Sequence, residues 1–244
     1  MSHVKVEVFT DFDGTLSVQD TGCLLIDDEK SMGVDKRRQL EHRIMEGTMK
    51  YRDAVYQMWD SVGLTLEEAW DKHLNHCHVD PGFPGFYKYC KEREFPVVVV
   101  SSGLEPVVRQ VLSNFMGEEA NNIEVVANNA NINDRKWEII YRDETEHGND
   151  KSLALSKARA AADENTIFVF CGDGVSDISA AKHCDLLFAR NGKDLVTYCT
   201  RHNIPFIGFD SFEEIHKIVE DLVDGKTRLE KDTATGYCKV VSIA

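Results

Sequence analysis

Two carboxylates, Asp11 and Asp13, stand at the end of the apolar stretch 4–10, directly before a glycine. β-Branched and aromatic residues dominate this stretch, which predicts a buried strand of a parallel sheet. Open α/β sheets bind their ligands at the carboxyl ends of the strands. Side chains two residues apart in an extended chain point the same way, so both aspartates can face one crevice. Taken alone, the run is also compatible with an Asp-Gly turn that has no chemical role.

Two later sites could bind an anion. Ser101 ends the apolar run 96–101 and Ser102 follows it, where hydroxyls and backbone amides either bind an anion or cap the next helix. Lys151 opens the predicted helix 152–162 against the helix dipole. A bound phosphate would reverse that penalty, although a solvated surface lysine is the simpler alternative.

A third site is the run Gly172-Asp173-Gly174, which follows the predicted strand 166–171 and is followed by Asp177. Glycine permits tight turning and close approach of the backbone to a ligand. Carboxylate oxygens at one sheet edge suit Mg²⁺, which takes few protein ligands and keeps several waters. An ordinary turn explains this run poorly, because it repeats the placement of the first two aspartates.

Together these residues resemble the four motifs of the haloacid dehalogenase (HAD) superfamily, in the family's order. The matching segments are Asp11-Phe12-Asp13-Gly14-Thr15, Ser101, Lys151 and Gly172-Asp173-Gly174-Val175-Ser176-Asp177. They span both ends of the predicted core, up to about residue 225. The resemblance implies an α/β fold with a Rossmann-like parallel-sheet core, and a Mg²⁺-dependent phosphomonoesterase that works through an aspartyl-phosphate.

The resemblance also implies the roles of the acidic residues. Asp11 would attack phosphorus, and Asp13 would protonate the leaving oxygen and then take a proton from the hydrolytic water. Mg²⁺ would be held by the Asp11 side chain, the Asp13 backbone carbonyl and Asp173. Asp177 would support this metal site, as would Ser176, which stands where the family usually has asparagine.

Ser101, its neighbour Ser102 and Lys151 would by the same resemblance bind the phosphate. In the phosphoserine phosphatase-like branch, an acid nine residues after the nucleophile contacts the substrate, and Asp20 fills that place. The phosphoserine enzymes also use a cap arginine, whose place falls near Met58, which cannot bind an anion. The pattern is closer to the methionine-salvage enolate phosphatase and related fungal phosphatases, which argues against phosphoserine as the substrate.

Hydrophobic periodicity supports the same fold class. Predicted strands are 4–10, 96–101, 123–127, 166–171, 186–189 and 205–209, and predicted helices are 105–115, 152–162, 176–183, 193–202 and 211–222. Strands that alternate with helices predict a parallel sheet with helices on both faces. Residues 130–142 break the alternation and predict an added β-hairpin.

The region between the first two predicted strands contains only helical patterns. A capping box at Thr65 and Glu68 opens one of its helices. We therefore predict an inserted helical cap at 17–82, which resembles the family's C1 cap. Residues 1–16 and 83–225 would form the catalytic core, and residues 226–244 a polar, weakly patterned C-terminal tail.

Composition excludes several classes of partner. The net charge of −14 opposes nucleic acids and anionic membranes, and no apolar run is long enough to cross a bilayer. The N-terminus also lacks the pattern of a signal peptide. Seven cysteines without a CxxC pair fit reduced thiols of the cytosol. We expect a cytoplasmic protein, a monomer or a homodimer, with no nucleic-acid or membrane partner.

A histidine- and cysteine-rich cluster offers a second candidate metal site. Its members are His73, His76, Cys77 and His78. Their spacing matches no ordinary structural zinc site, so a hinge or a contact between cap and core is the better interpretation.

The residues therefore predict a phosphatase of a small phosphorylated metabolite with Mg²⁺ as its cofactor. One alternative is a phosphotransferase in which an alcohol replaces water as the acceptor. Another is a non-catalytic metabolite-binding protein of the same fold, which is disfavoured because every catalytic position is filled.

Overall fold

A computed structural model describes residues 4–233 and 235–243, which cluster into two compact units. The first unit comprises the chain up to Leu16, the segment Asp80–Val100 and the chain from Lys151 onward. The second comprises Ser17–Val79 and Ser101–Asp150. A seven-stranded sheet has the order β4-β3-β2-β1-β5-β6-β7, and its strand β2 passes from the first unit into the second.

Parallel strands form the centre of the first unit, as predicted. They are β1 (Lys5–Thr10), β2 (Val97–Leu104) in its first half, β5 (Thr166–Gly172), β6 (Leu186–Arg190) and β7 (Ile207–Phe209). β1 pairs with β5 in a register that ends at Thr10 opposite Cys171. Its pairing with β2 is also parallel. The carboxyl ends of β1 and β5 therefore meet at one edge, and the predicted α/β fold is confirmed.

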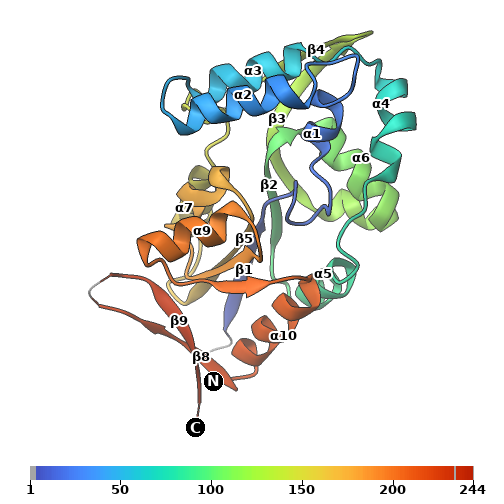
Figure 1. Cartoon of the computed structure of the whole chain (residues 1–244). Helices are drawn as coiled ribbons and strands as arrows, with labels where there is room; N and C mark the ends of the chain where they lie inside the picture. Colours follow the sequence, from blue (N-terminus) through green and yellow to red (C-terminus); the bar gives the residue numbers. More distant parts are fainter. Residues whose placement is uncertain (1–3, 234, 244) are drawn as a thin grey trace. The chain divides into compact units, whose positions relative to one another are not determined.

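Helices cover this sheet on both sides (Figure 1). They are α5 (Phe83–Glu92), α7 (Lys151–Ala161), α8 (Ile178–Ala181), α9 (Asp194–His202) and α10 (Phe212–Val223). Aromatic contacts tie α5 to α10, since the rings of Phe83 and Phe212 meet edge to face at 5.2 Å. The sequence did not predict α5, although its buried residues recur at helical spacing from Phe83 to Cys90.

Two predictions for this unit need correction. The helix predicted at 176–183 is a 3₁₀ turn, Val175–Asp177, followed by the short α8, because the Asp177 side chain accepts hydrogen bonds that tighten the turn. The weakly patterned tail beyond residue 225 contains an antiparallel pair, β8 (Thr227–Lys231) and β9 (Cys238–Ser242). Half-buried and exposed side chains alternate along β8, which supports a strand against α10.

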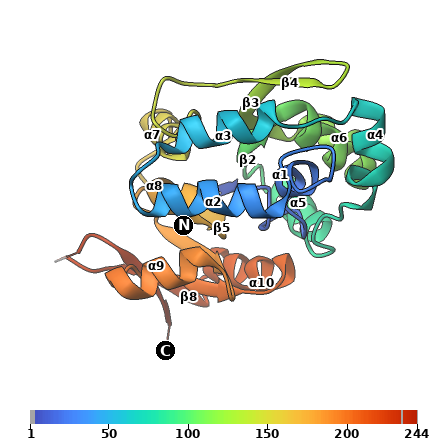
Figure 2. The same ribbon diagram turned by 45° about the horizontal axis from the view of Figure 1, so that its top comes forward.

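The second unit combines short helices with a β-hairpin. Its elements are α1 (Thr21–Ile26), α2 (Val34–Met45), α3 (Tyr51–Asp60), α4 (Leu66–Lys72), α6 (Glu105–Met116), the 3₁₀ segments Leu74–His76 and Gly117–Asn122, and the strands β3 (Glu124–Asn133) and β4 (Lys136–Ile140). Figure 2 shows α2 and α3 side by side. The capping box that opens α4 is confirmed, with reciprocal bonds between Thr65 and Glu68.

The hairpin belongs with the helices of this unit. Its first arm is the continuation of β3, so the separately predicted strand and hairpin are one antiparallel β3–β4 pair. On β4, the buried Trp137 stacks on Trp59 of α3 with ring centres 6.0 Å apart. Its Nε1 donates to the Leu64 carbonyl at 2.8 Å. Residues 101–150 cluster with these helices in the second unit. The predicted division, which places those residues in the catalytic core, stays a prediction.

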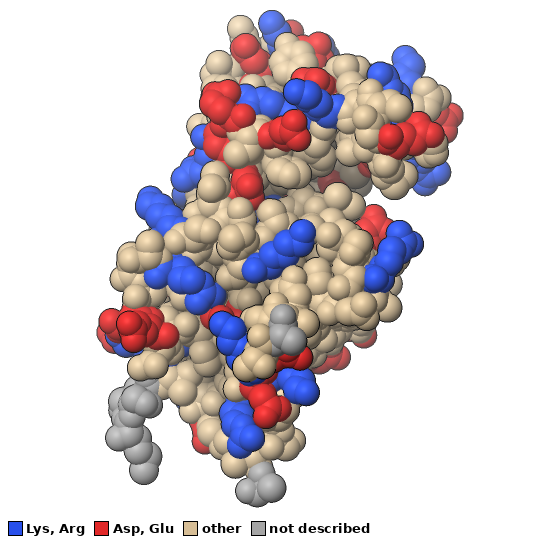
Figure 3. All heavy atoms as spheres, turned by 90° about the vertical axis from the view of Figure 1, so that its left-hand side faces the viewer, with Lys and Arg blue, Asp and Glu red and all other residues tan. Residues whose placement is uncertain are grey.

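The surface carries both signs of charge. On the face shown in Figure 3, basic and acidic side chains are interspersed, so the net charge of −14 does not gather there into one patch. Across residues 4–233 and 235–243, no helix combines the length and apolar character needed to cross a membrane.

The indole of Trp137 provides a test of how the hairpin is held. Trp137→Phe should lower the free energy of unfolding by about 1–3 kcal/mol more than Trp59→Phe, because it leaves the buried Leu64 carbonyl without its donor. Trp59→Phe is a matched control that shrinks the same ring stack and spares that hydrogen bond. Equal losses in denaturant titrations would show that the hydrogen bond contributes nothing.

Candidate active site

Asp11 lies at the edge where β1 and β5 end. Its backbone N–H donates to the Cys171 carbonyl at 2.8 Å, which continues the β1–β5 pairing by one step. Its side chain is only 6% exposed. The parallel register therefore holds this carboxylate beside the Gly172–Asp173 turn that follows β5.

Lys151, the first residue of α7, joins two carboxylates. Its Nζ lies 2.5 Å from Asp11 Oδ1 and 2.6 Å from Asp177 Oδ1, and the side chains of Lys151 and Asp177 are fully buried. The alternative of a solvated surface lysine is wrong. Burial lowers the pKa of Lys151, but the two carboxylates outweigh it and raise the pKa above its ordinary value. The lysine therefore stays charged.

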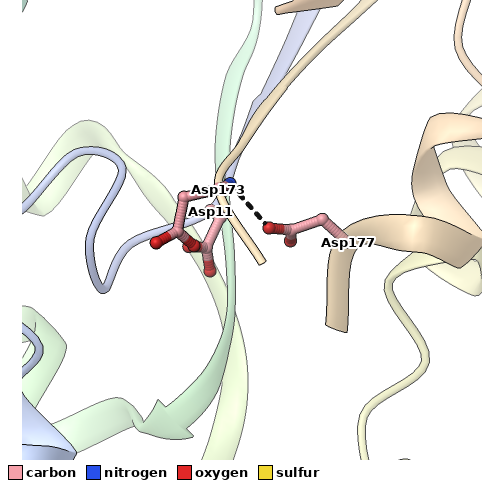
Figure 4. Close-up of side chains that lie close together, drawn as sticks. All are labelled: Asp11, Asp173 and Asp177. Atoms are coloured by element: carbon pink, nitrogen blue, oxygen red, sulfur yellow. Dashed lines mark hydrogen bonds between the residues drawn. The ribbon is translucent and has the colours of Figure 1, made fainter. Parts of the chain in front are cut away.

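Both carboxylate oxygens of Asp177 accept hydrogen bonds within the protein. While Oδ1 accepts from Lys151, Oδ2 accepts from the backbone N–H groups of Asp173 and Gly174, each at 2.9 Å. Figure 4 shows the carboxylates of Asp11 and Asp173 side by side, with Asp177 bonded to the Asp173 backbone. Asp177 thus fixes the turn that carries Asp173 and leaves Asp11 and Asp173 to face a ligand.

Two glycines of the predicted motifs leave no room for a side chain. A Cβ on Gly14, whose φ is +79°, would lie 2.3 Å from Asp173 Oδ2. A Cβ on Gly172 would lie 2.7 Å from the Asp177 carboxylate. Close approach of the backbone to the acids therefore requires glycine at both positions, and at Gly14 the left-handed φ requires it as well.

The acids outnumber the buried cations, which makes the site suitable for a divalent metal. Ligand atoms of Asp11, Asp173 and Asp177 lie within 4.8 Å of one another, the single such group of His, Cys, Asp or Glu within 4–233 and 235–243. Burial raises the pKa of Asp11 to about 7, with Asp177 adding to the rise and Lys151 opposing it. Burial, then the charges of Asp11 and Asp177, raise the pKa of Asp173 to about 8. Oxygen ligands crowded to this degree fit Mg²⁺.

Sequence reasoning missed a second lysine at this site. Lys193, at the N-terminus of α9, places Nζ 3.7 Å from Asp173 Oδ2 and is about half exposed. The backbone of the same helix start also contacts the site, because the Leu195 N–H donates to the Asp173 carbonyl at 2.8 Å. Strand β6 and the turn after it place Lys193 near Asp173, and no local sequence motif predicts that contact.

The remaining predicted residues of the first unit lie on the same segments. Asp13 is partly exposed and stands two residues beyond Asp11, between β1 and the Gly14 turn. Ser176 is partly exposed in the 3₁₀ turn next to Asp177. Their roles in proton transfer and in metal support stay predictions.

The predicted phosphate-binding serines belong to the second unit. Ser101 is buried, and its Oγ accepts the Gly103 N–H at 2.9 Å. Two buried asparagines that the sequence analysis missed hold the backbone here: Asn149 Nδ2 donates to the Ser101 carbonyl at 2.7 Å, and Asn128 Nδ2 to the Ser102 carbonyl at 2.8 Å. The position of Asn149, two residues before Lys151, is the sequence signal that could have identified it.

Asp20 has a local structural role. It is the N-cap of α1, and its Oδ1 accepts the Cys23 N–H at 2.7 Å while the residue is exposed. Met58, at the place of the family's cap arginine, is buried. In the histidine-rich cluster, His73 Nε2 pairs with Asp28 Oδ2 at 2.8 Å. This pair gives that histidine a structural partner other than a metal.

Comparison with known proteins agrees with this geometry. The sequence profile of the haloacid dehalogenase-like hydrolases matches residues 8–182. Pdp3-interacting factor 1 of Schizosaccharomyces pombe is 41% identical, over 89% of this chain and 96% of its own. Polyol phosphate phosphatase PYP1 of Saccharomyces cerevisiae is 36% identical, over 91% and 96%.

More distant matches extend over nearly the same part of the chain. A 2-hydroxy-3-keto-5-methylthiopentenyl-1-phosphate phosphatase of Bacillus cereus is 22% identical, over 91% of this chain and 100% of its own. A solved structure of a phospho-aspartyl intermediate analogue of phosphoserine phosphatase superposes with a TM-score of 0.64 at 20% identity. That match covers 88% of this chain and 98% of the other, and it shows a shared fold.

Gly14, the glycine directly after the first two aspartates, gives a direct test of the site's packing. Gly14→Ala should destabilise the protein by about 1–3 kcal/mol and displace the Asp173 carboxylate, because the new Cβ meets Oδ2 in a left-handed backbone. Gly174→Ala is the matched control, since Gly174 has an extended backbone and nothing within 4 Å of an added Cβ. Similar unfolding free energies for the two variants would contradict the proposed close approach.

Proposed function

Because the chain belongs to the haloacid dehalogenase-like hydrolase family, we propose that it is a Mg²⁺-dependent phosphatase that works through an aspartyl-phosphate on Asp11. Its phosphatase relatives make it a phosphoric monoester hydrolase of small phosphorylated metabolites. The observation that supports the mechanism is the buried Lys151, whose Nζ donates hydrogen bonds to both Asp11 Oδ1 and Asp177 Oδ1.

The proposed reaction has two displacements at phosphorus. Asp11 attacks with one carboxylate oxygen, the bond between phosphorus and the ester oxygen breaks, and Asp13 gives its proton to that leaving oxygen. Water then attacks the acyl-phosphate while Asp13 takes a proton from it. The bond to Asp11 breaks, and inorganic phosphate leaves. The Lys151 ammonium orients the nucleophile and offsets negative charge on the phosphate in both steps.

The donor set supports Mg²⁺ as the cofactor. Asp11, Asp173 and the Asp13 backbone carbonyl would hold the ion, which when bound supplies positive charge that brings the phosphate and the carboxylate together. Asp177 acts in support, because Lys151 and two backbone N–H groups already occupy its oxygens. The raised pKa values of Asp11 and Asp173 support this assignment, since a cation would stabilise both ionised forms.

Substrate recognition is expected in the second unit. The buried Met58 offers no cation to a substrate carboxylate, which argues against a phosphoamino acid. The relatives named for polyol phosphate and for a ketose-like enol phosphate support a hydroxylated, uncharged leaving group. Asp20 is the proposed contact with its hydroxyls, in addition to its role as an N-cap. The cytoplasmic location and the monomeric or dimeric state stay predictions.

Replacing the nucleophile tests the mechanism. Asp11→Asn should lower hydrolysis across a panel of phosphorylated metabolites by several orders of magnitude, with Mg²⁺ present, because an amide cannot form the acyl-phosphate. Asp163→Asn, at a surface pair with Lys5, is the control and should keep full activity. Residual Mg²⁺-dependent hydrolysis by Asp11→Asn near the control's rate would refute the aspartyl-phosphate. Added alcohol acceptors would reveal any phosphotransfer product.

Two variants at Asp20 separate helix capping from substrate contact. Asparagine caps a helix about as well as aspartate, whereas alanine costs about 1 kcal/mol at an N-cap. If Asp20 contacts the substrate, both Asp20→Asn and Asp20→Ala should change selectivity across the metabolite panel, because both remove the carboxylate. Only Asp20→Ala should also lose stability, because it removes the helix cap. Unchanged selectivity in Asp20→Asn would assign Asp20 to capping alone.

A further inference from the structure

The loop that leads into Lys151 is closed by one carboxylate. In this segment, residues 143–150 and here called the lysine loop, Asp143 Oδ2 accepts the Asp150 N–H at 2.8 Å. Asp143 Oδ1 accepts the Thr145 N–H at 2.9 Å, and its own N–H donates to the Gly148 carbonyl at 3.0 Å. Asp143 thereby ties the start of the loop to the residue directly before Lys151.

An arginine of helix α3 holds the lysine loop from outside. Arg52 Nη1 donates to the carbonyls of Asp143 at 2.7 Å and Thr145 at 3.2 Å. The Arg52 backbone N–H donates to the Glu146 carbonyl at 3.1 Å. These three bonds to main-chain carbonyls fix the path of the loop, whichever side chains it carries.

Tyr141 completes the contact between α3 and the loop. The Arg52 guanidinium lies 4.2 Å from the centre of its ring, and its hydroxyl donates to the Arg52 carbonyl at 2.6 Å. A Cβ on Gly148, whose φ is +73°, would lie 2.1 Å from the same ring, so the loop packs closely against the tyrosine. The loop is therefore shaped to rest on Tyr141 and Arg52.

A surface ion pair does not explain these contacts. Arg52 lies 3.5 Å from the carboxylate of Glu144, but that side chain is 98% exposed, and pairs of this kind contribute little. The hydrogen bonds from the Arg52 side chain to the loop carbonyls therefore explain an arginine at position 52. At its far end, the loop's Asn149 also donates to the carbonyls of Ser101 and Val126.

We propose that Arg52 and Asp143 are positioning residues for the phosphatase reaction, which set the place of the Lys151 ammonium through the lysine loop. This inference rests on the proposed function, in which Lys151 bonds the nucleophile Asp11. Arg52 and Asp143 hold the loop as far as Asp150, and Asp150 is bonded directly to Lys151, so the path of the loop sets the backbone from which the Lys151 side chain extends. A displacement of about 1 Å in a catalytic group can cost a hundredfold in rate.

The test compares two arginines of the same unit. Arg135 also bonds a main-chain carbonyl, that of Gly63 at 2.8 Å, and pairs with Glu68, but it does not touch the lysine loop. Arg52→Ala should lower kcat roughly tenfold to a hundredfold, and Arg135→Ala should leave kcat near the wild-type value at a comparable loss of thermal stability. Arg52→Lys, which keeps one donor for the loop carbonyls, should restore part of kcat.

Amide hydrogen exchange supplies a second measurement that needs no activity. The peptide covering 143–151 should exchange faster in Arg52→Ala and in Asp143→Ala than in Arg135→Ala. Equal kcat values for Arg52→Ala and Arg135→Ala, or equal exchange in this peptide, would overturn the positioning role. A wild-type protein without phosphatase activity would instead refute the proposed function, and the exchange comparison would still decide on the loop.

Discussion

The buried ammonium of Lys151 is the interaction on which the rest of the site depends. A fully buried charge is costly unless it is paired and hydrogen-bonded, and removing one partner leaves the other uncompensated. Here the partners come from the end of β1, through Asp11, and from the turn after β5, through Asp177. The charge therefore joins three elements of the first unit, since Lys151 itself begins α7.

The same arrangement leaves negative charge in surplus. Lys151 offsets only part of the charge of the three clustered aspartates, and the half-exposed Lys193 stands near Asp173 alone. Burial, and then this crowding of carboxylates, raise the pKa values of Asp11 and Asp173. Crowded carboxylates with strongly shifted pKa values are typical of sites that serve chemistry more than stability.

The second unit is built around contacts with the β3–β4 hairpin and the lysine loop. Trp137 attaches the hairpin to the helices through its stack on Trp59 and its bond to Leu64. Arg52 attaches the loop in the same way, with main-chain carbonyls as acceptors. Helices inserted after the first strand and a hairpin from the middle of the chain thus share one packed unit, although Leu64 and Trp137 are 73 residues apart in sequence.

The sequence by itself determined which elements carry the candidate site residues: acids follow β1, serines lie on β2, a lysine opens α7, and acids follow β5. These positions on the elements agree with the structure because strand ends and helix starts are local patterns, and because a parallel sheet gathers strand ends at one edge, whereas the chemical roles stay predictions. Only the tertiary structure decided that Lys151 bonds both Asp11 and Asp177, that Lys193 lies near Asp173, and that Arg52 holds the loop before Lys151. Such contacts join residues distant in sequence through side-chain geometry and burial, which leave no periodic trace in the chain.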